Sequence, residues 1–299
     1  MRNKLILSLL AVLLWIVPAK AGETVDIIAV NFPAYDIARS VCGENAAVEL
    51  LLPPGSESHS YEPTPQDMIA IQNADLFIFT GGESDHWLES LIASMGSDAP
   101  AVFRMADCIV PLEEEHEHED HYHSEEHVHE MDEHVWTSPR NVMQIAQALA
   151  AVLGPDTAPT EKLDAYLKEL SDLDAAFREA VSSGVRRKMV FGDRFPMRYF
   201  AHEYGLDYEA AFPGCSEDSE PSVRTVISLV DLIREEEIPV VFYIEFSSRR
   251  TADILCEETG AKALLFHSCH NVSAAEMEAG ATYLSLMRNN LEALKEALR

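Results

Sequence analysis

The sequence predicts an α/β protein of two lobes, each with a parallel-type sheet, joined by a single long backbone helix. Short apolar runs alternate with helical patterns in both halves of the chain. Such continuous apolar runs are typical of strands that a parallel sheet buries on both faces. Between the two halves lies one longer amphipathic stretch, 160–182, which we interpret as the helix that connects the lobes.

The first half begins with the β-branched run 24–30, which favours a strand. Further strands are expected at 48–52, 74–80 and 101–103, and helices at 32–41, 65–73, 87–91 and from 139 to the Gly154-Pro155 stop. The polar loop 55–65 follows the carboxyl end of a strand, which is the edge where open α/β sheets bind ligands. His59 in this loop is therefore a candidate ligand.

The stretch 160–182 would span roughly 30 Å as a helix. Its central position favours a rigid connector between lobes, and the alternative is an ordinary core helix of a single domain. Its apolar stripe at three- and four-residue spacing consists of Leu163, Tyr166, Leu167, Leu170, Leu173, Phe177 and Val181.

The second half repeats the pattern of the first. Strands are expected at 187–191, 208–212, 240–244 and 263–266, and helices at 199–204, 221–237, 251–259 and 274–299. Asp193 follows the first of these strands and His267 the last. Both are candidate ligands at a sheet edge, for the same reason as His59.

Residues 1–21 have the composition of a cleaved signal peptide: Arg2 and Lys4, then an apolar core, then Ala19-Lys20-Ala21. The apolar core is short for a membrane span, and no cysteine follows it to carry a lipid anchor. We therefore expect an exported, periplasmic protein without a membrane span, although an uncleaved segment would tether it.

The charge of the chain is −29, and −32 without Arg2, Lys4 and Lys20. This excess of acid argues against nucleic acid as a partner, because phosphates are bound by Lys and Arg. It favours cations as ligands.

The five cysteines suggest at least one disulfide in an oxidising compartment. We favour Cys215 with Cys269, because both lie in turn-like sequence after apolar runs. The odd number leaves one thiol over.

A histidine-rich acidic run, 113–130, is predicted to be a mobile loop, because it has no apolar face to bury. Imidazole and carboxylate are both zinc ligands, so the run could collect metal at several weak sites. The alternative is a solvated acidic linker. Its histidines are His116, His118, His121, His123, His127 and His129.

His134 lies beyond this run among apolar anchors, and we interpret it as a fixed ligand. Together with His59, Asp193 and His267 it would form a site with two ligands from each half. Three imidazoles and a carboxylate suit Zn²⁺, while Mn²⁺ prefers more oxygen ligands. Cys269 and His270 are reserve ligands beside His267.

Besides the histidine-rich loop and the long central helix, the chain contains the motifs PPGSESHSYEPTPQD, EHVWTSPRN, YGL at 204–206 and ETGAK at 258–262. In these features it resembles the ZnuA-like (cluster A-I, or cluster 9) substrate-binding proteins of zinc and manganese ABC importers. The resemblance covers nearly all of the mature chain.

This resemblance implies two Rossmann-like lobes, one metal ion between them and delivery to a membrane ABC permease. His59 and His134 match the family's ligands in the first lobe. In the second lobe the chain departs from the family, with Asp193-Arg194 where a His-Asp pair is usual and His267 where Asp is common. The two changes would leave a carboxylate and an imidazole in exchanged positions, unless Arg194 occupies the site and leaves three histidines and water.

The expected organisation is a signal peptide at 1–21, a first lobe at 22–156, a connecting helix at 157–184 and a second lobe at 185–299. We expect a monomeric, non-enzymatic protein that binds Zn²⁺ for uptake. The alternatives are a Mn²⁺-binding member of the same class, a zinc-dependent hydrolase, and a metal-buffering adhesin. No HExxH motif supports the hydrolase.

Overall fold

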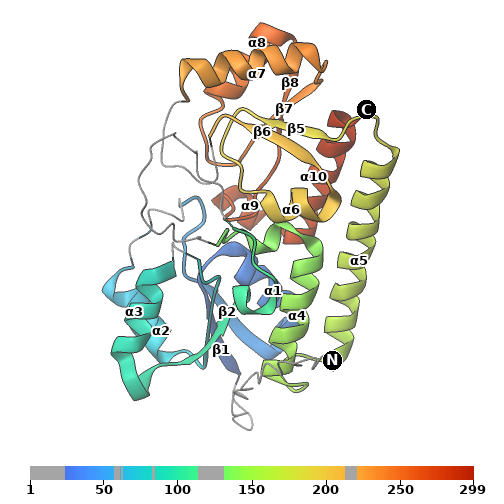
Figure 1. The fold of residues 1–299 in the computed structure, drawn as a ribbon. Coiled ribbons are helices and arrows are strands. Elements are labelled where there is room, and N and C mark those ends of the chain that lie inside the picture. The colour runs from blue at the N-terminus through green and yellow to red at the C-terminus, as the bar shows by residue number, and fades with distance from the viewer. Residues whose placement is uncertain (1–23, 57–60, 62, 83–84, 114–130, 213–220) are drawn as a thin grey trace, which may run out of the picture.

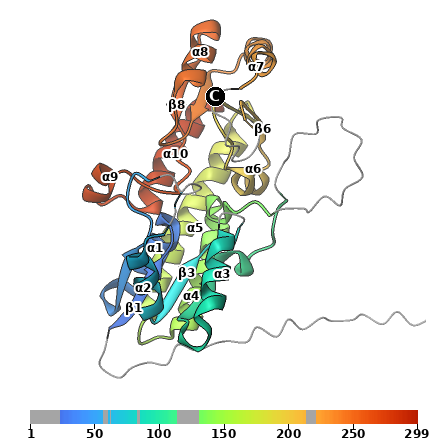
Figure 2. The same ribbon diagram turned by 90° about the vertical axis from the view of Figure 1, so that its left-hand side faces the viewer.

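The structure is a computed structural model that describes residues 24–56, 61, 63–82, 85–113, 131–212 and 221–299. It confirms the predicted fold class of two parallel α/β lobes joined by a long helix. The lobes are stacked along the molecule, and helix α5 runs beside both of them (Figures 1 and 2). None of the described helices is long and apolar enough to cross a membrane.

The N-terminal lobe contains a four-stranded parallel sheet in the order β2-β1-β3-β4. Alternate side chains of its central strands enter two different cores: Ile27 and Ala29 face α1, α4 and α5, while Ile28 and Val30 face α2 and α3. Burial on both faces explains why these strands are apolar throughout. The elements are β1 (Val25–Ala29), α1 (Phe32–Cys42), β2 (Ala46–Leu50), α2 (Pro65–Asn73), β3 (Leu76–Phe79), α3 (His86–Met95), β4 (Ala101–Arg104) and α4 (Pro139–Leu153).

The C-terminal lobe has the same topology, with the strand order β6-β5-β7-β8. Phe191 and Phe242 face the core shared with α5, while Val190 and Val241 face α7 and α8. The elements are β5 (Lys188–Phe191), α6 (Arg198–Tyr204), β6 (Asp207–Ala210), α7 (Val223–Glu235), β7 (Val240–Tyr243), α8 (Arg250–Thr259), β8 (Lys262–Leu265), α9 (Ala274–Glu278) and α10 (Tyr283–Ala297).

The closing helix expected at 274–299 is wrong as one element, because the structure divides it into α9 and α10. Gly280 has a φ of 75°, which ends the first helix. Thr282 then caps the second by accepting a hydrogen bond from the backbone N–H of Ser285. Because strong helix formers lie on both sides of Gly280, the spacing of apolar residues alone predicts one continuous helix.

Helix α5 (Thr160–Ser183) carries the predicted apolar stripe and packs against α4 of one lobe and α10 of the other. Its buried residues Leu170 and Phe177 belong to one continuous apolar core that contains residues of both sheets. The lobes are therefore joined by a shared interior as well as by a connecting chain.

A second connection is made by the residues 267–273 that follow β8, which we call the junction loop. Trp136 donates its indole N–H to the carbonyl of Ser268 (2.9 Å). Asn271 donates from its amide Nδ2 to the carbonyls of Pro53 (2.8 Å) and Ser56 (2.9 Å). The Asn271 bonds hold a segment of the C-terminal lobe against the residues that follow β2 in the N-terminal lobe.

Asp36 is a buried acid at the same boundary. It lies in α1 with 3% of its surface exposed, and its Oδ2 accepts a hydrogen bond from the backbone N–H of Tyr283 in α10 (2.9 Å). Burial raises the pKa of Asp36 to about 6, although the Tyr283 N–H and the Arg39 guanidinium oppose this shift. The ionised carboxylate is therefore a cost to the folded state.

We predict that the change in unfolding free energy caused by Asp36→Asn is more favourable at pH 7.5 than at pH 4. Between the ordinary pKa of 3.8 and about 6 the native state holds a proton that the unfolded chain releases, so the wild type loses stability as pH rises. Asparagine keeps an oxygen for the Tyr283 N–H and does not ionise. The relative gain in unfolding free energy should reach up to about 3 kcal/mol, measured by urea denaturation at both pH values. An equal effect at the two pH values would contradict the assignment.

Candidate metal centre

His134 is held rigidly before the short 3-10 turn Val135–Thr137. Only 3% of it is exposed. The Asp132 carboxylate accepts hydrogen bonds from the backbone N–H of His134 (2.8 Å) and from its ring Nδ1 (3.0 Å). Because a carboxylate can only accept, the proton lies on Nδ1, and Nε2 keeps its lone pair. This carboxylate–histidine arrangement is the one that commonly orients a metal-ligating imidazole.

His270 comes from the junction loop and faces His134 from the other lobe. Its ring lies 4.8 Å from the ring of Trp136 and 5.5 Å from the ring of His134, between centroids. Its backbone N–H donates to the Ser268 hydroxyl (3.2 Å), and the Glu245 carboxylate in turn accepts from the Ser268 backbone N–H (2.8 Å). The position of His270 is therefore set by groups of the C-terminal lobe.

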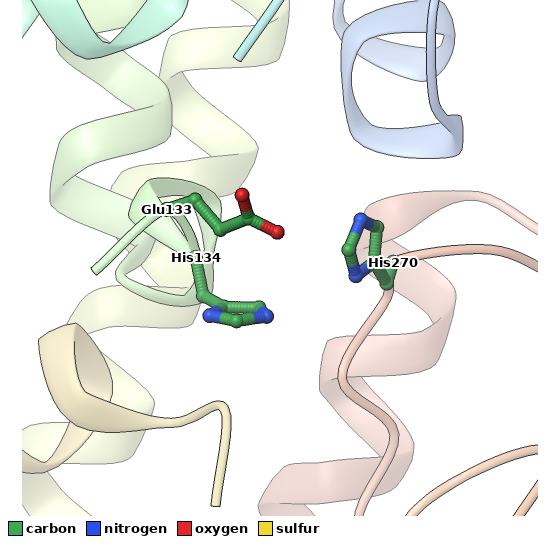
Figure 3. Close-up of side chains that lie close together, drawn as sticks. All are labelled: Glu133, His134 and His270. Atoms are coloured by element: carbon green, nitrogen blue, oxygen red, sulfur yellow. The ribbon is translucent and has the colours of Figure 1, made fainter. Parts of the chain in front are cut away.

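Glu133 completes a group with these two histidines: one ligand atom from each of the three lies within 4.8 Å of the others. Figure 3 shows Glu133 and His134 projecting from one side toward His270 on the other. Gly82 makes room for Glu133, since a Cβ at that glycine would lie 2.3 Å from the Glu133 Cβ.

The surroundings of Glu133 favour a cation. Asp85 is 7% exposed and lies close enough for its charge to interact with that of Glu133. Burial raises the pKa of Asp85 to about 6; the Gly81 N–H opposes this shift, and the Glu133 carboxylate adds to it. A pocket of about 20 Å³, lined in part by Asn31, Glu133 and His270, has room for one water molecule or ion. Two imidazoles and a carboxylate at this spacing form a donor set typical of zinc.

His267, a predicted ligand, lies outside this group and is engaged elsewhere. Its Nδ1 accepts the backbone N–H of Cys269 (2.9 Å), so its proton lies on Nε2, which is 3.6 Å from the Glu276 carboxylate. Its backbone is held by Asn290, which accepts its N–H (2.7 Å) and donates to its carbonyl (2.8 Å). In this structure His267 anchors the junction loop that carries His270.

Asp193, the other predicted ligand of the second lobe, is also turned to internal contacts. Its carboxylate accepts from the backbone N–H groups of Arg194 (2.8 Å) and Ile244 (3.1 Å) and from the Ser247 hydroxyl. Burial raises its pKa, while these donors oppose the shift. The carboxylate thus joins the ends of β5 and β7 within the C-terminal lobe.

Several predicted residues lie outside the described part of the chain. These are His59, Cys215 and the loop histidines His116, His118, His121, His123, His127 and His129. Cys269 is a fully buried thiol, and the disulfide with Cys215 stays a prediction because Cys215 is not among the described residues. The Cys269 Sγ points back to the carbonyl of His267 (3.8 Å).

Glu133 is not among the ligands that the sequence predicts, and His270 is predicted only as a reserve ligand beside His267. Glu133 opens the motif EHVWTSPRN, and its burial together with Asp132 and His134 marks it as part of the folded lobe rather than of the acidic run. His267 and His270 follow the same strand. Their spacing alone does not say which imidazole faces the other lobe, and the Asn290 contacts decide it.

Comparison with known proteins gives a consistent picture. A family model described as zinc-uptake complex component A, periplasmic, matches residues 27–297. The chain is 32% identical over 286 residues to the high-affinity zinc uptake system protein ZnuA of Bacillus subtilis, covering 93% of this chain and 88% of that protein. It is 30% identical over 284 residues to the zinc-binding lipoprotein AdcA of Streptococcus pneumoniae, covering 93% of this chain and 56% of AdcA. The chain thus spans little more than half the length of AdcA.

Solved structures agree with these matches. The Zn(II)-bound ZnuA-like domain of AdcA from S. pneumoniae superposes with a TM-score of 0.76 at 27% identity, covering 92% of this chain and 99% of the domain. The metal-dependent lipoprotein YcdH of B. subtilis superposes with a TM-score of 0.79 at 27% identity, with the same coverage.

We predict that Asp132→Ala lowers divalent-metal affinity about 10- to 100-fold, the usual effect of losing the group that orients a ligand imidazole. Asp132→Asn keeps an acceptor for Nδ1 but loses the charge, and should cost less. Calorimetric titration with Zn²⁺ measures both. Asp164→Ala, which removes an exposed acid of α5, is the control and should leave affinity unchanged. An Asp132→Ala protein with wild-type affinity would exclude this role for the carboxylate.

Proposed function

Because the chain belongs to the family of periplasmic components of zinc-uptake complexes, we propose that it captures Zn²⁺ between its lobes and delivers it to a membrane ABC permease. The observation that carries this proposal is the group of Glu133, His134 and His270, which draws ligand atoms from both lobes to within 4.8 Å. His59 follows β2 in the chain, at the predicted ligand-binding edge, and we propose it as a further ligand.

The chemistry of the group favours Zn²⁺ over Mn²⁺. Two of the three side chains are imidazoles, and nitrogen donors suit zinc, whereas manganese is bound mainly by oxygen. The fixed tautomer of His134 offers Nε2 to the metal without a proton to displace. Before they could bind the same ion, His267 would have to lose the Nε2 proton that faces the Glu276 carboxylate (3.6 Å), and Asp193 would have to give up the hydrogen bonds described above.

The proposed role is transport rather than catalysis, and the proposed location is the periplasm. Export would depend on residues 1–21, which precede the described part of the chain. We further propose that the protein works as a monomer and that the histidine-rich run 113–130 concentrates metal near the site. The base of this run is closed by an antiparallel bridge between Glu113 and Met131, so removing 114–130 should leave the site intact.

We predict that His134→Ala and His270→Ala each abolish the tight Zn²⁺ site, because each removes a ligand contributed by a different lobe. Glu133→Gln should weaken it. His202→Ala, which removes an exposed histidine of α6, should leave it unchanged. Competition titration with a zinc chelator gives the affinities, and X-ray data at the zinc absorption edge identify the ligands.

Deleting 114–130 should remove several weak Zn²⁺ sites and retain one tight site, measured by calorimetry. Two results would overturn the proposal: loss of the tight site on this deletion, or an ion held by residues of one lobe alone.

A further inference from the structure

A larger pocket, of about 370 Å³, lies in the C-terminal lobe at the carboxyl ends of β5 and β7. The chain leaves these adjacent strands toward opposite faces of the sheet: α6, after β5, packs into the shared core, and α8, after β7, packs on the other side. Open α/β sheets bind ligands at such a switch point. The volume is within the usual range for small-molecule sites.

The N-terminal lobe has the same strand topology, and it too has a pocket at its switch point. Its switch point lies between β1 and β3, and the small pocket next to the metal group is lined there by Val30, Asn31 and Thr80. The two lobes therefore each have a pocket at the equivalent place. The metal group adjoins the first pocket, and none of its three members lines the second.

The acidic groups of the second pocket are already satisfied by internal donors. Asp193 accepts three hydrogen bonds from its own lobe. Glu245 accepts from both the backbone N–H and the hydroxyl of Ser268. Little acceptor capacity remains to bind a cation.

Donors, by contrast, are plentiful along the lining. Arg194 and Arg250 both line the pocket, and each guanidinium carries five N–H donors. Ser248 and Thr251 add hydroxyls beside the start of α8. Gly192 lets α8 approach closely, since a Cβ there would lie 2.5 Å from the Cα of Ala252.

The rest of the lining is apolar and is formed by Phe212, Val226, Ile244 and Ile254, among others. A bare inorganic anion would leave this wall unused. A molecule with one carboxylate and a short apolar chain would use both parts of the pocket.

We propose that this pocket is a second ligand site, separate from the metal centre, which binds a small organic carboxylate. Arg194 and Arg250 hold the carboxylate, and the apolar wall contacts the remainder. The net negative charge of the chain does not prevent this, because charges beyond roughly 8 Å are screened at physiological salt.

The test is ligand binding to the whole protein by saturation-transfer NMR and calorimetry at physiological salt. The probes are isovalerate and 4-methyl-2-oxopentanoate, with isovaleramide as the neutral analogue and inorganic phosphate as the bare anion. At least one carboxylate should bind saturably with one molecule per chain, and more tightly than isovaleramide or phosphate. Binding of phosphate alone, equal binding of isovaleramide, or no saturable binding would each overturn the proposal.

The variants localise the site. Arg194→Gln and Arg250→Gln should each weaken carboxylate binding about tenfold, as expected for loss of a charge-assisted hydrogen bond. Arg249→Gln is the matched control, because Arg249 lies over the Tyr243 ring, bonds Asp253 and does not line the pocket. An equal loss in Arg249→Gln would point to general electrostatics and refute the site. His134→Ala should retain carboxylate binding, so failure of the metal assignment and failure of this one remain distinguishable.

Discussion

The hydrogen bond from the Trp136 indole to the carbonyl of Ser268 is the contact on which the rest of the centre depends. It joins the segment that carries Glu133 and His134 to the loop that carries His270. The buried Trp136 ring also packs against His270. Tyr283 reinforces the contact from α10 by donating its hydroxyl to the Trp136 carbonyl (2.9 Å). One aromatic side chain therefore fixes the spacing between candidate ligands of different lobes.

The electrostatics of the centre follow from this close packing. Glu133 and Asp85 are both buried and lie close enough for their charges to interact. Burial raises the pKa of Asp85, and repulsion by the Glu133 carboxylate adds to the shift. A divalent cation would relieve this repulsion. Asp132 contacts both lobes. Its backbone carbonyl accepts a hydrogen bond from the Tyr199 hydroxyl of α6, in the C-terminal lobe, while its carboxylate orients His134 in the N-terminal lobe.

Much of this architecture was accessible from the sequence. Strands buried on both faces leave an apolar signature that needs no knowledge of their neighbours, and β3 and β7 show it plainly. The choice among side chains at a sheet edge is different in kind. Whether His267 or His270 faces the other lobe depends on Asn290, 23 residues further on, and Asp193 is captured by Ser247, 54 residues away. Such long-range hydrogen bonds leave no local pattern to read. The break between α9 and α10 is different, because Gly280 and the Thr282 cap are local signals.

The apolar core that runs through α5 into both sheets has a consequence for how such proteins can be recombined. One face of each sheet packs into a core of its own lobe, but the other face packs into the shared core, so each half supplies part of the surface that the other buries. A chimera that exchanges one half between relatives would have to carry α5 and α10 together with their partners on α1 and α4.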